Sequence, residues 1–207
     1  MNYWHEFITV AIINFLAVVS PGPDFALITR NSLLYSRKAG IYSAFGLGLG
    51  ILIHVTYCII GVGLIISKSL LLFNLIKYIG AGYLIYIGYL SLTDKYHKLG
   101  NQKNKHSDKK TDPDKFIRMG FITNVTNPKA TLFFLSLFTV VIQQNTPVLV
   151  KYFYGIIMSL ITFFWFTFVS IILSHKIIKE KIAKFQFIFE KIMGFILILL
   201  ALKILII

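Results

Sequence analysis

Six apolar runs of about 18 residues or more constrain this chain more than any other feature of its sequence. Each run is long enough to cross the hydrocarbon core of a bilayer as a helix, which satisfies its own backbone hydrogen bonds in lipid. The sequence therefore predicts an all-α integral membrane protein with six transmembrane helices. The expected spans are residues 4–28, 41–66, 76–92, 116–142, 148–173 and 187–207.

Composition supports the bilayer as the solvent of this chain. Only 14% of the 207 residues are charged and 57% are hydrophobic, whereas a soluble domain carries about 25% charged residues. The net charge of +13 would suggest nucleic acid in a soluble protein. Here the basic residues lie in loops between apolar runs, as membrane insertion requires. We therefore expect a lipid-embedded protein with no nucleic-acid partner.

A hydrophilic segment, residues 94–115, lies near the middle of the chain and is rich in Lys and Asp. It has too few apolar residues to form a core, so we expect a flexible charged loop. Lys and Arg are concentrated in the odd-numbered loops, which places loop 94–115 in the cytoplasm and both termini outside. We read residues 1–207 as one transmembrane domain with half-repeats at about 1–93 and 116–207.

Two of the expected spans, the first and the fourth, are interrupted by proline next to polar and charged residues. Proline removes a backbone donor and clashes with the preceding turn, and glycine loosens the chain further. Such a break persists in a membrane only against protein or a watery cavity. The residues concerned are Pro21, Gly22, Pro23 and Asp24 in the first span and Asn124, Asn127, Pro128 and Lys129 in the fourth.

The positions of these two breaks predict an inverted repeat. Each break lies in the first span of a three-span half, and an odd number of spans makes the second half enter the membrane from the opposite side. Many secondary transporters are built this way, with broken helices at the substrate site. A single proline kink is more often structural, but two kinks beside intramembrane charges favour a transport site.

Asp24 and Lys129 are the intramembrane charges of these breaks. Either charge costs about 2.5–3.5 kcal/mol at a helix centre on insertion scales, so each needs a partner. One hypothesis is that they approach each other or hold the ammonium and carboxylate of a zwitterionic ligand. The alternative is that Asp24 lies near the cytoplasmic interface and merely caps the restarted helix.

Three other polar residues within the expected spans are weaker candidates: Asn14, His54 and Tyr57. They would line a cavity in a transporter, and His54 would suit a proton carrier because histidine titrates near neutral pH. Each is more often an interhelical hydrogen-bonding residue. The sequence leaves both interpretations open.

The motifs around both breaks, with several others, match a known pattern that covers the whole chain. The matching stretches are Pro21-Gly22-Pro23-Asp24, Arg37-Lys38-Ala39-Gly40, Gly46 to Gly50, Tyr78 to Gly88, Asn127-Pro128-Lys129-Ala130, Phe133-Phe134 and Gly194. In these motifs the chain resembles the LysE/RhtB family of amino-acid exporters. One departure is that many relatives have a proline shortly after the Phe pair, where this chain reads Leu137-Phe138-Thr139.

The resemblance implies export of amino acids or related small metabolites from the cytoplasm, driven by the proton gradient. It also implies a multi-pass protein of the bacterial plasma (inner) membrane with a compact six-helix fold, forming a homodimer. The residues of the two breaks would then form the substrate site. No cofactor, metal ligand or catalytic residue is expected.

Other functions fit less well but stay open at this point. A pump would need a glycine-rich phosphate loop ending in Gly-Lys, which the sequence lacks. An intramembrane hydrolase would need paired carboxylates, a zinc motif or a nucleophile with its base, and the five histidines of this chain are scattered along it. Lone Cys58 opposes thiol-electron transfer. A metal-cation exporter is a closer rival, although Lys129 would repel a cation. A membrane assembly protein would not need two matching breaks.

Overall fold

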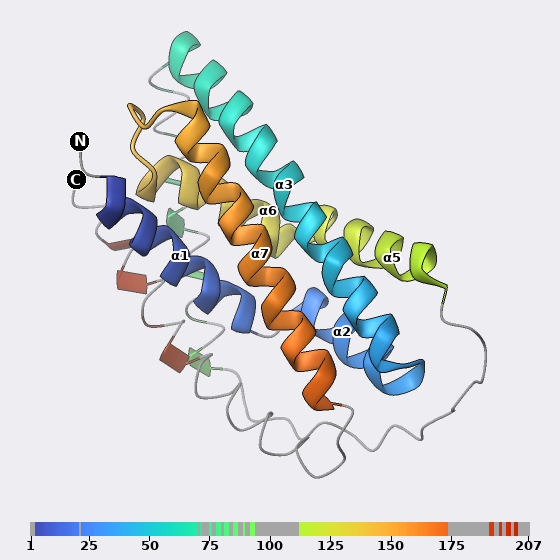
Figure 1. Cartoon of the computed structure of the whole chain (residues 1–207). Coiled ribbons are helices and arrows are strands. Elements are labelled where there is room, and N and C mark those ends of the chain that lie inside the picture. The colour runs from blue at the N-terminus through green and yellow to red at the C-terminus, as the bar shows by residue number, and fades with distance from the viewer. Residues whose placement is uncertain are drawn as a thin grey trace.

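The computed structural model describes residues 3–20, 22–69 and 112–173 without interruption, and isolated positions between 71 and 93 and between 191 and 202. Pro21, Gly194, loop residues 94–111 and most of the expected spans at 76–92 and 187–207 lie outside the described residues. The described part is all helical. Its elements are α1 (Tyr3–Val19), α2 (Pro23–Leu34), α3 (Arg37–Lys68), α5 (Pro113–Val125), α6 (Pro128–Ser136), η1 (Leu137–Val141) and α7 (Val148–Leu173) (Figure 1).

Two of the described helices are long and apolar enough to cross a membrane, namely Arg37–Gly61 of α3 and all of α7. Helices α1 and α2 form a third candidate span if they are taken together, and their axes meet at 56°. The described residues thus show an all-helical membrane protein with two or three candidate spans. The six-helix arrangement in two inverted repeats stays a prediction.

Both expected helix breaks are present, and local chemistry explains each. Helix α1 ends at Val19 and α2 restarts with Pro23 at its first turn, while α5 ends at Val125 and α6 restarts with Pro128. Proline suits the first turn of a helix because the amide hydrogen it lacks has no partner there. The expected fourth span, residues 116–142, is therefore α5, α6 and the π-helical η1 in succession.

Helix α5 begins at Pro113, ahead of the expected start of the span at residue 116. The reason is the cap at Asp112, whose side chain accepts hydrogen bonds from the backbone N–H groups of Asp114 and Lys115. An aspartate before a first-turn proline is a strong helix start. Sequence hydropathy misses this turn because its exposed residues are polar.

Helix α3 is the central element and packs most extensively against α5 and α7 (Figure 1). Glycines permit the close approach of α3 and α5. A Cβ atom on Gly46 would overlap the backbone of Ile117 in α5, and one on Gly120 would overlap the backbone of Ser43 in α3. In lipid no hydrophobic force drives helices together, so they associate through close packing, which small residues at such crossings permit.

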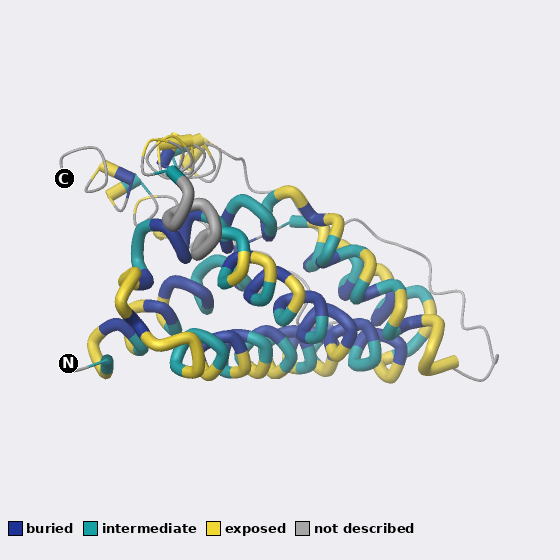
Figure 2. Tube along the Cα trace, turned by 90° about the horizontal axis from the view of Figure 1, so that it is seen from above, coloured by how far each residue is buried: buried dark blue, intermediate teal, exposed yellow. Residues whose placement is uncertain are grey.

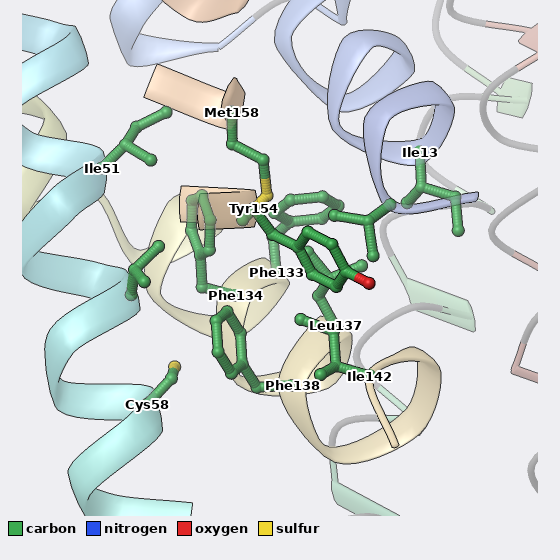
Figure 3. Packing of buried hydrophobic residues seen from close by; sticks show 12 residues of the cluster. Ile13, Ile51, Cys58, Phe133, Phe134, Leu137, Phe138, Ile142, Tyr154 and Met158 are labelled. Atoms are coloured by element: carbon green, nitrogen blue, oxygen red, sulfur yellow. The ribbon is translucent and has the colours of Figure 1, made fainter. Parts of the chain in front are cut away.

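Apolar side chains fill the space between these helices. Figure 3 shows one cluster, in which Ile13 of α1, Ile51 and Cys58 of α3, Phe134 of α6 and Met158 of α7 point toward one another. Buried residues face the inside of the bundle and exposed residues follow its outer sides (Figure 2). The packed interior holds the two helix breaks at fixed positions against α3.

Candidate functional site

The two helix breaks meet at the carboxylate of Asp24. Asn124, in the last turn of α5, donates from Nδ2 to Asp24 Oδ2 at 2.8 Å, and Asn127 donates from Nδ2 to Asp24 Oδ1 at 3.0 Å. Asn124 and Asn127 are buried, and Asp24 is half-buried. Residues separated by about a hundred positions in the chain thus form one polar site, as the inverted-repeat hypothesis requires.

Asn127 also shapes the start of α6. It is the residue before the helix, and its Oδ1 accepts a hydrogen bond from the backbone N–H of Lys129 at 3.0 Å. The same side chain therefore caps α6 with its oxygen and binds Asp24 with its nitrogen. Pro128 follows as the first helical residue and is exposed.

The start of α2 is built differently. Gly22 is the residue before the helix, its backbone is extended, and no side chain caps the helix. Exposed Pro23 opens the first turn, and Asp24 follows. The suggestion that Asp24 merely caps this helix is wrong, because its carboxylate accepts from the two asparagines across the bundle. Its negative charge still favours the positive end of the α2 dipole.

Lys129 lies across the first break. Its Nζ donates to Ser20 Oγ at 2.7 Å, and a Cβ atom on Gly22 would lie 3.5 Å from its Cδ and 3.6 Å from its Nζ. The charge of Lys129 also acts on Asp24. The structure therefore brings the two predicted charges to one place. Pro21 is the one predicted site residue that lies outside the described residues.

His54 of α3 joins this site as a neighbour of Asn124. Its Nε2 lies 3.0 Å from the Asn124 carbonyl oxygen, and its Nδ1 lies 2.6 Å from the Tyr57 hydroxyl. Its ring is fully buried and stacks on Phe134 at a centroid distance of 5.3 Å. His54 and Tyr57 were weak candidates in sequence, and only their contacts with the second break distinguish them from ordinary packing residues.

The site lies about midway along α3, the longest helix in the described part of the chain. Helix α3 has 32 residues and is roughly 48 Å long at 1.5 Å per residue. Gly50 and His54, which both contact Asn124, are near its centre. A polar site halfway along a membrane-length helix is where broken-helix transporters bind their substrates.

A second carboxylate, Glu6 in α1, was not singled out by sequence reasoning. It is buried, and Thr146 Oγ1 lies 3.0 Å from each of its carboxylate oxygens. Lys151, near the start of α7, acts on it electrostatically. The available signal was an acidic residue inside the first apolar run. Asn14, the third weak candidate, is buried and donates to the Met158 carbonyl oxygen at 3.3 Å.

Among the described residues, no three His, Cys, Asp or Glu side chains gather in a way that could hold a metal ion. The site is instead a carboxylate and an ammonium flanked by amides and hydroxyls. Interrupted helices that present both charges in an apolar bundle are typical of membrane transport proteins.

Comparison with known proteins agrees with this class. The chain belongs to the LysE type translocator family, which matches residues 15–207, and the resemblance read from the motifs is thereby confirmed. It is 31% identical over 200 residues to the uncharacterized membrane protein YrhP of Bacillus subtilis (strain 168), covering 94% of this chain and 95% of that protein.

Two further relatives carry functional names. The threonine efflux protein of Escherichia coli (strain K12) is 29% identical over 164 residues, or 79% of this chain and 80% of the relative. The leucine efflux protein of Salmonella choleraesuis (strain SC-B67) is 30% identical over 147 residues, or 71% of this chain and 66% of the relative. No solved structure matches the chain.

Proposed function

We propose that this chain exports amino acids, or closely related small metabolites, from the cytoplasm across the bacterial plasma membrane, coupled to the proton gradient. Membership of the LysE type translocator family supports export. Relatives named for efflux of threonine and of leucine support an amino acid as the substrate. The observation that carries the proposal is that the two helix breaks meet, with Asp24 bound by Asn124 and Asn127 of the second break and Lys129 bound by Ser20 of the first.

The charges of the site suit the two ends of a zwitterion. An ionised carboxylate has about four acceptor positions, and the amides of Asn124 and Asn127 use two of those on Asp24. The others are available to a substrate ammonium. A substrate carboxylate would lie at Lys129 and the N-terminus of α6, where both charges are positive.

The position of Lys129 itself argues for an anionic ligand. A lysine in the first turn of a helix opposes the helix dipole, at a cost of about 0.3–1 kcal/mol. Lys129 occupies this unfavourable place at the start of α6. Binding of a carboxylate there would offset the unfavourable interaction of Lys129 with the dipole and would neutralise its half-buried charge.

The architecture that we propose has six transmembrane helices in two inverted three-helix repeats. The half-repeats are residues 1–93 and 116–207, and the charged loop 94–115 lies in the cytoplasm with both termini outside. The corresponding breaks at α1–α2 and α5–α6 support the repeat, and the distribution of Lys and Arg supports the orientation. We further propose a homodimer by resemblance to the family.

Efflux measurements test the function directly. Proteoliposomes preloaded with labelled threonine, leucine and a panel of other amino acids should release at least one of them in the presence of the protein. Lys129→Ala and Asp24→Asn should each reduce the initial rate about tenfold or more, whereas Lys38→Ala, an exposed lysine at the start of α3, should not.

Two outcomes would contradict the proposal. Normal efflux by both site variants at normal membrane levels would remove the site assignment. Export of a metal cation with no efflux of any amino acid would contradict the proposed function and favour a metal-cation exporter.

Cysteine introduced at Asn2 and at Asn104 tests the orientation, because only the first should react with an impermeant reagent outside intact cells.

A further inference from the structure

Six residues around the two helix breaks form a closed ring of polar contacts, which runs through their side chains and through the backbone carbonyl groups of Asn124 and Asn127. The ring connects four helices, α2, α3, α5 and α6, and it contains the carboxylate of the proposed substrate site. Its members in order are Asp24, Asn124, His54, Tyr57, Thr131 and Asn127.

One side of the ring runs from Asp24 to Tyr57 through α5. Asn124 donates from its side chain to Asp24 at 2.8 Å and accepts at its backbone oxygen from His54 Nε2 at 3.0 Å. His54 then contacts the Tyr57 hydroxyl through Nδ1 at 2.6 Å. His54 is thus one residue removed from the substrate-binding carboxylate on this side.

The other side returns through the start of α6. The Tyr57 hydroxyl interacts with the side chain of Thr131, and Thr131 Oγ1 donates to the Asn127 carbonyl oxygen at 3.2 Å. Asn127 donates from Nδ2 to Asp24 at 3.0 Å. His54 therefore reaches both of the asparagines that hold Asp24.

The partners of His54 fix which of its nitrogens can change protonation. A carbonyl oxygen only accepts, so Nε2 carries a hydrogen toward Asn124. In the neutral ring Nδ1 then accepts from the Tyr57 hydroxyl. A hydroxyl is both donor and acceptor and can rotate, so Nδ1 can gain a proton and become the donor to Tyr57 without losing its hydrogen bond. Tyr57 can then donate to Thr131.

We propose that His54 is the residue that binds the transported proton and couples it to the substrate site. This inference rests on the proposed proton-coupled export. Nδ1 gains one proton and one positive charge when the site is open to the outside, and the same proton leaves when the site opens to the cytoplasm. No other covalent bond forms or breaks. Histidine suits this step because it changes charge near neutral pH.

Charge gives the coupling its sign. Among the described residues, the carboxylate of Asp24 interacts electrostatically with His54. Lys129 in turn interacts electrostatically with Asp24. The titratable residues Tyr57 and Cys58 lie about one turn further along α3 than His54. An imidazolium beside this site would compete with a substrate ammonium for Asp24. Proton and substrate then weaken each other's binding, which is the reciprocal linkage that exchange in opposite directions needs.

The proposal predicts that coupling and translocation can be separated at His54. Glutamine cannot take up a proton but retains an amide donor for the Asn124 carbonyl and an oxygen acceptor for the Tyr57 hydroxyl. In proteoliposomes, an outside pH below the inside pH should stimulate wild-type substrate efflux. His54→Gln should abolish this stimulation while retaining measurable exchange of labelled for unlabelled substrate at equal pH. Efflux should drive proton uptake, followed by an internal pH dye, in the wild type and not in the variant.

His5→Gln is the matched control, since His5 is an exposed histidine of α1, and it should behave like the wild type. Tyr57→Phe removes the hydroxyl that lets Nδ1 alternate, and it should reduce the pH stimulation several-fold. Full stimulation in a correctly inserted His54→Gln would overturn the proposal. If that variant does not accumulate in the membrane, full stimulation in Tyr57→Phe would overturn it instead.

The same assay separates this inference from the proposed function. A wild-type protein that neither exports nor exchanges any amino acid contradicts the proposed function. A wild type that exports without a pH response removes proton coupling and this inference with it. If Glu6→Gln loses the pH stimulation and His54→Gln does not, the proton binds at Glu6, and the role of His54 is overturned.

Discussion

The two helix breaks have the same sequence plan but differ in what stabilises them. Each restarts with a first-turn proline followed by a charged residue, Asp24 in α2 and Lys129 in α6. The α5–α6 break caps itself through Asn127, whereas the α1–α2 break has no side-chain cap at Gly22. The first break depends on the second, because the asparagines of the second hold Asp24.

The two breaks therefore have different supports within the same polar site. The α5–α6 break is stabilised by its own cap at Asn127, whereas the α1–α2 break is stabilised by hydrogen bonds from across the bundle. Asp24, at the dependent break, is favoured by its helix dipole, while Lys129 is opposed by its own. The helix dipoles therefore act with opposite sign on the two charges, although Asp24 and Lys129 occupy corresponding positions in the two motifs.

The largest effect is expected for Asn127→Ala, which removes support from both breaks. Loss of the cap costs about 1 kcal/mol, and loss of a hydrogen bond to a charged group costs about 1.5–3 kcal/mol. We expect a lower unfolding temperature in detergent and a reduction of efflux of about tenfold or more. Asn127→Ser retains a capping oxygen but not the reach to Asp24. It should regain stability without regaining efflux, and recovery of both would contradict the dependence of the first break.

Gly50→Ala tests whether the second break requires the close packing of α3 against α5. A Cβ atom there would lie 2.6 Å from Asn124 Oδ1 and 2.8 Å from Asn124 Cβ, so α3 and α5 would have to separate. Overpacking of this kind costs about 1–3 kcal/mol. Thermal unfolding should show the loss, with efflux several-fold slower. Gly61→Ala is the matched control, because its Cβ would meet nothing within 4 Å, and an equal effect there would exclude the packing explanation.

Ser20→Ala should affect binding more than stability. It removes the hydroxyl that accepts from Lys129 Nζ at 2.7 Å, so the ammonium is held less firmly for a substrate carboxylate. We expect KM for efflux to rise about threefold to tenfold, in line with a charged hydrogen bond of roughly 1.5 kcal/mol. Ser20→Thr retains the hydroxyl and should retain KM. A change in maximal rate alone would argue against a role in binding.

The smallest effect is expected for Gly22→Ala. The Gly22 backbone is extended (φ 175°), which any residue adopts, and an added Cβ would make ordinary contacts of 3.5 Å and 3.6 Å with the Lys129 side chain. Efflux should stay within about twofold of the wild type, since the conformation is unstrained. A large loss of efflux would show that transport requires a backbone conformation at Gly22 other than the extended one.

Sequence reasoning anticipated both breaks because proline and glycine act locally. It also selected Asp24, Asn124, Asn127 and Lys129, because charges and amides stand out in apolar runs. It missed Glu6, whose acidic side chain lies in the first run but finds Thr146 only through the fold. It left His54 undecided, since a histidine on an apolar helix looks the same with or without a functional partner.

The order of residues suffices to predict that this chain lies in a membrane, where its helices break and which charges lie at the breaks. Apolar length, first-turn prolines and capping side chains are local properties, so the order of residues suffices to predict them. That both asparagines of the second break bind the carboxylate of the first, and that His54 contacts Asn124, follows only from the three-dimensional packing. Those contacts depend on helix register and close glycine packing between segments about 70 to 100 residues apart, and only the folded bundle sets them.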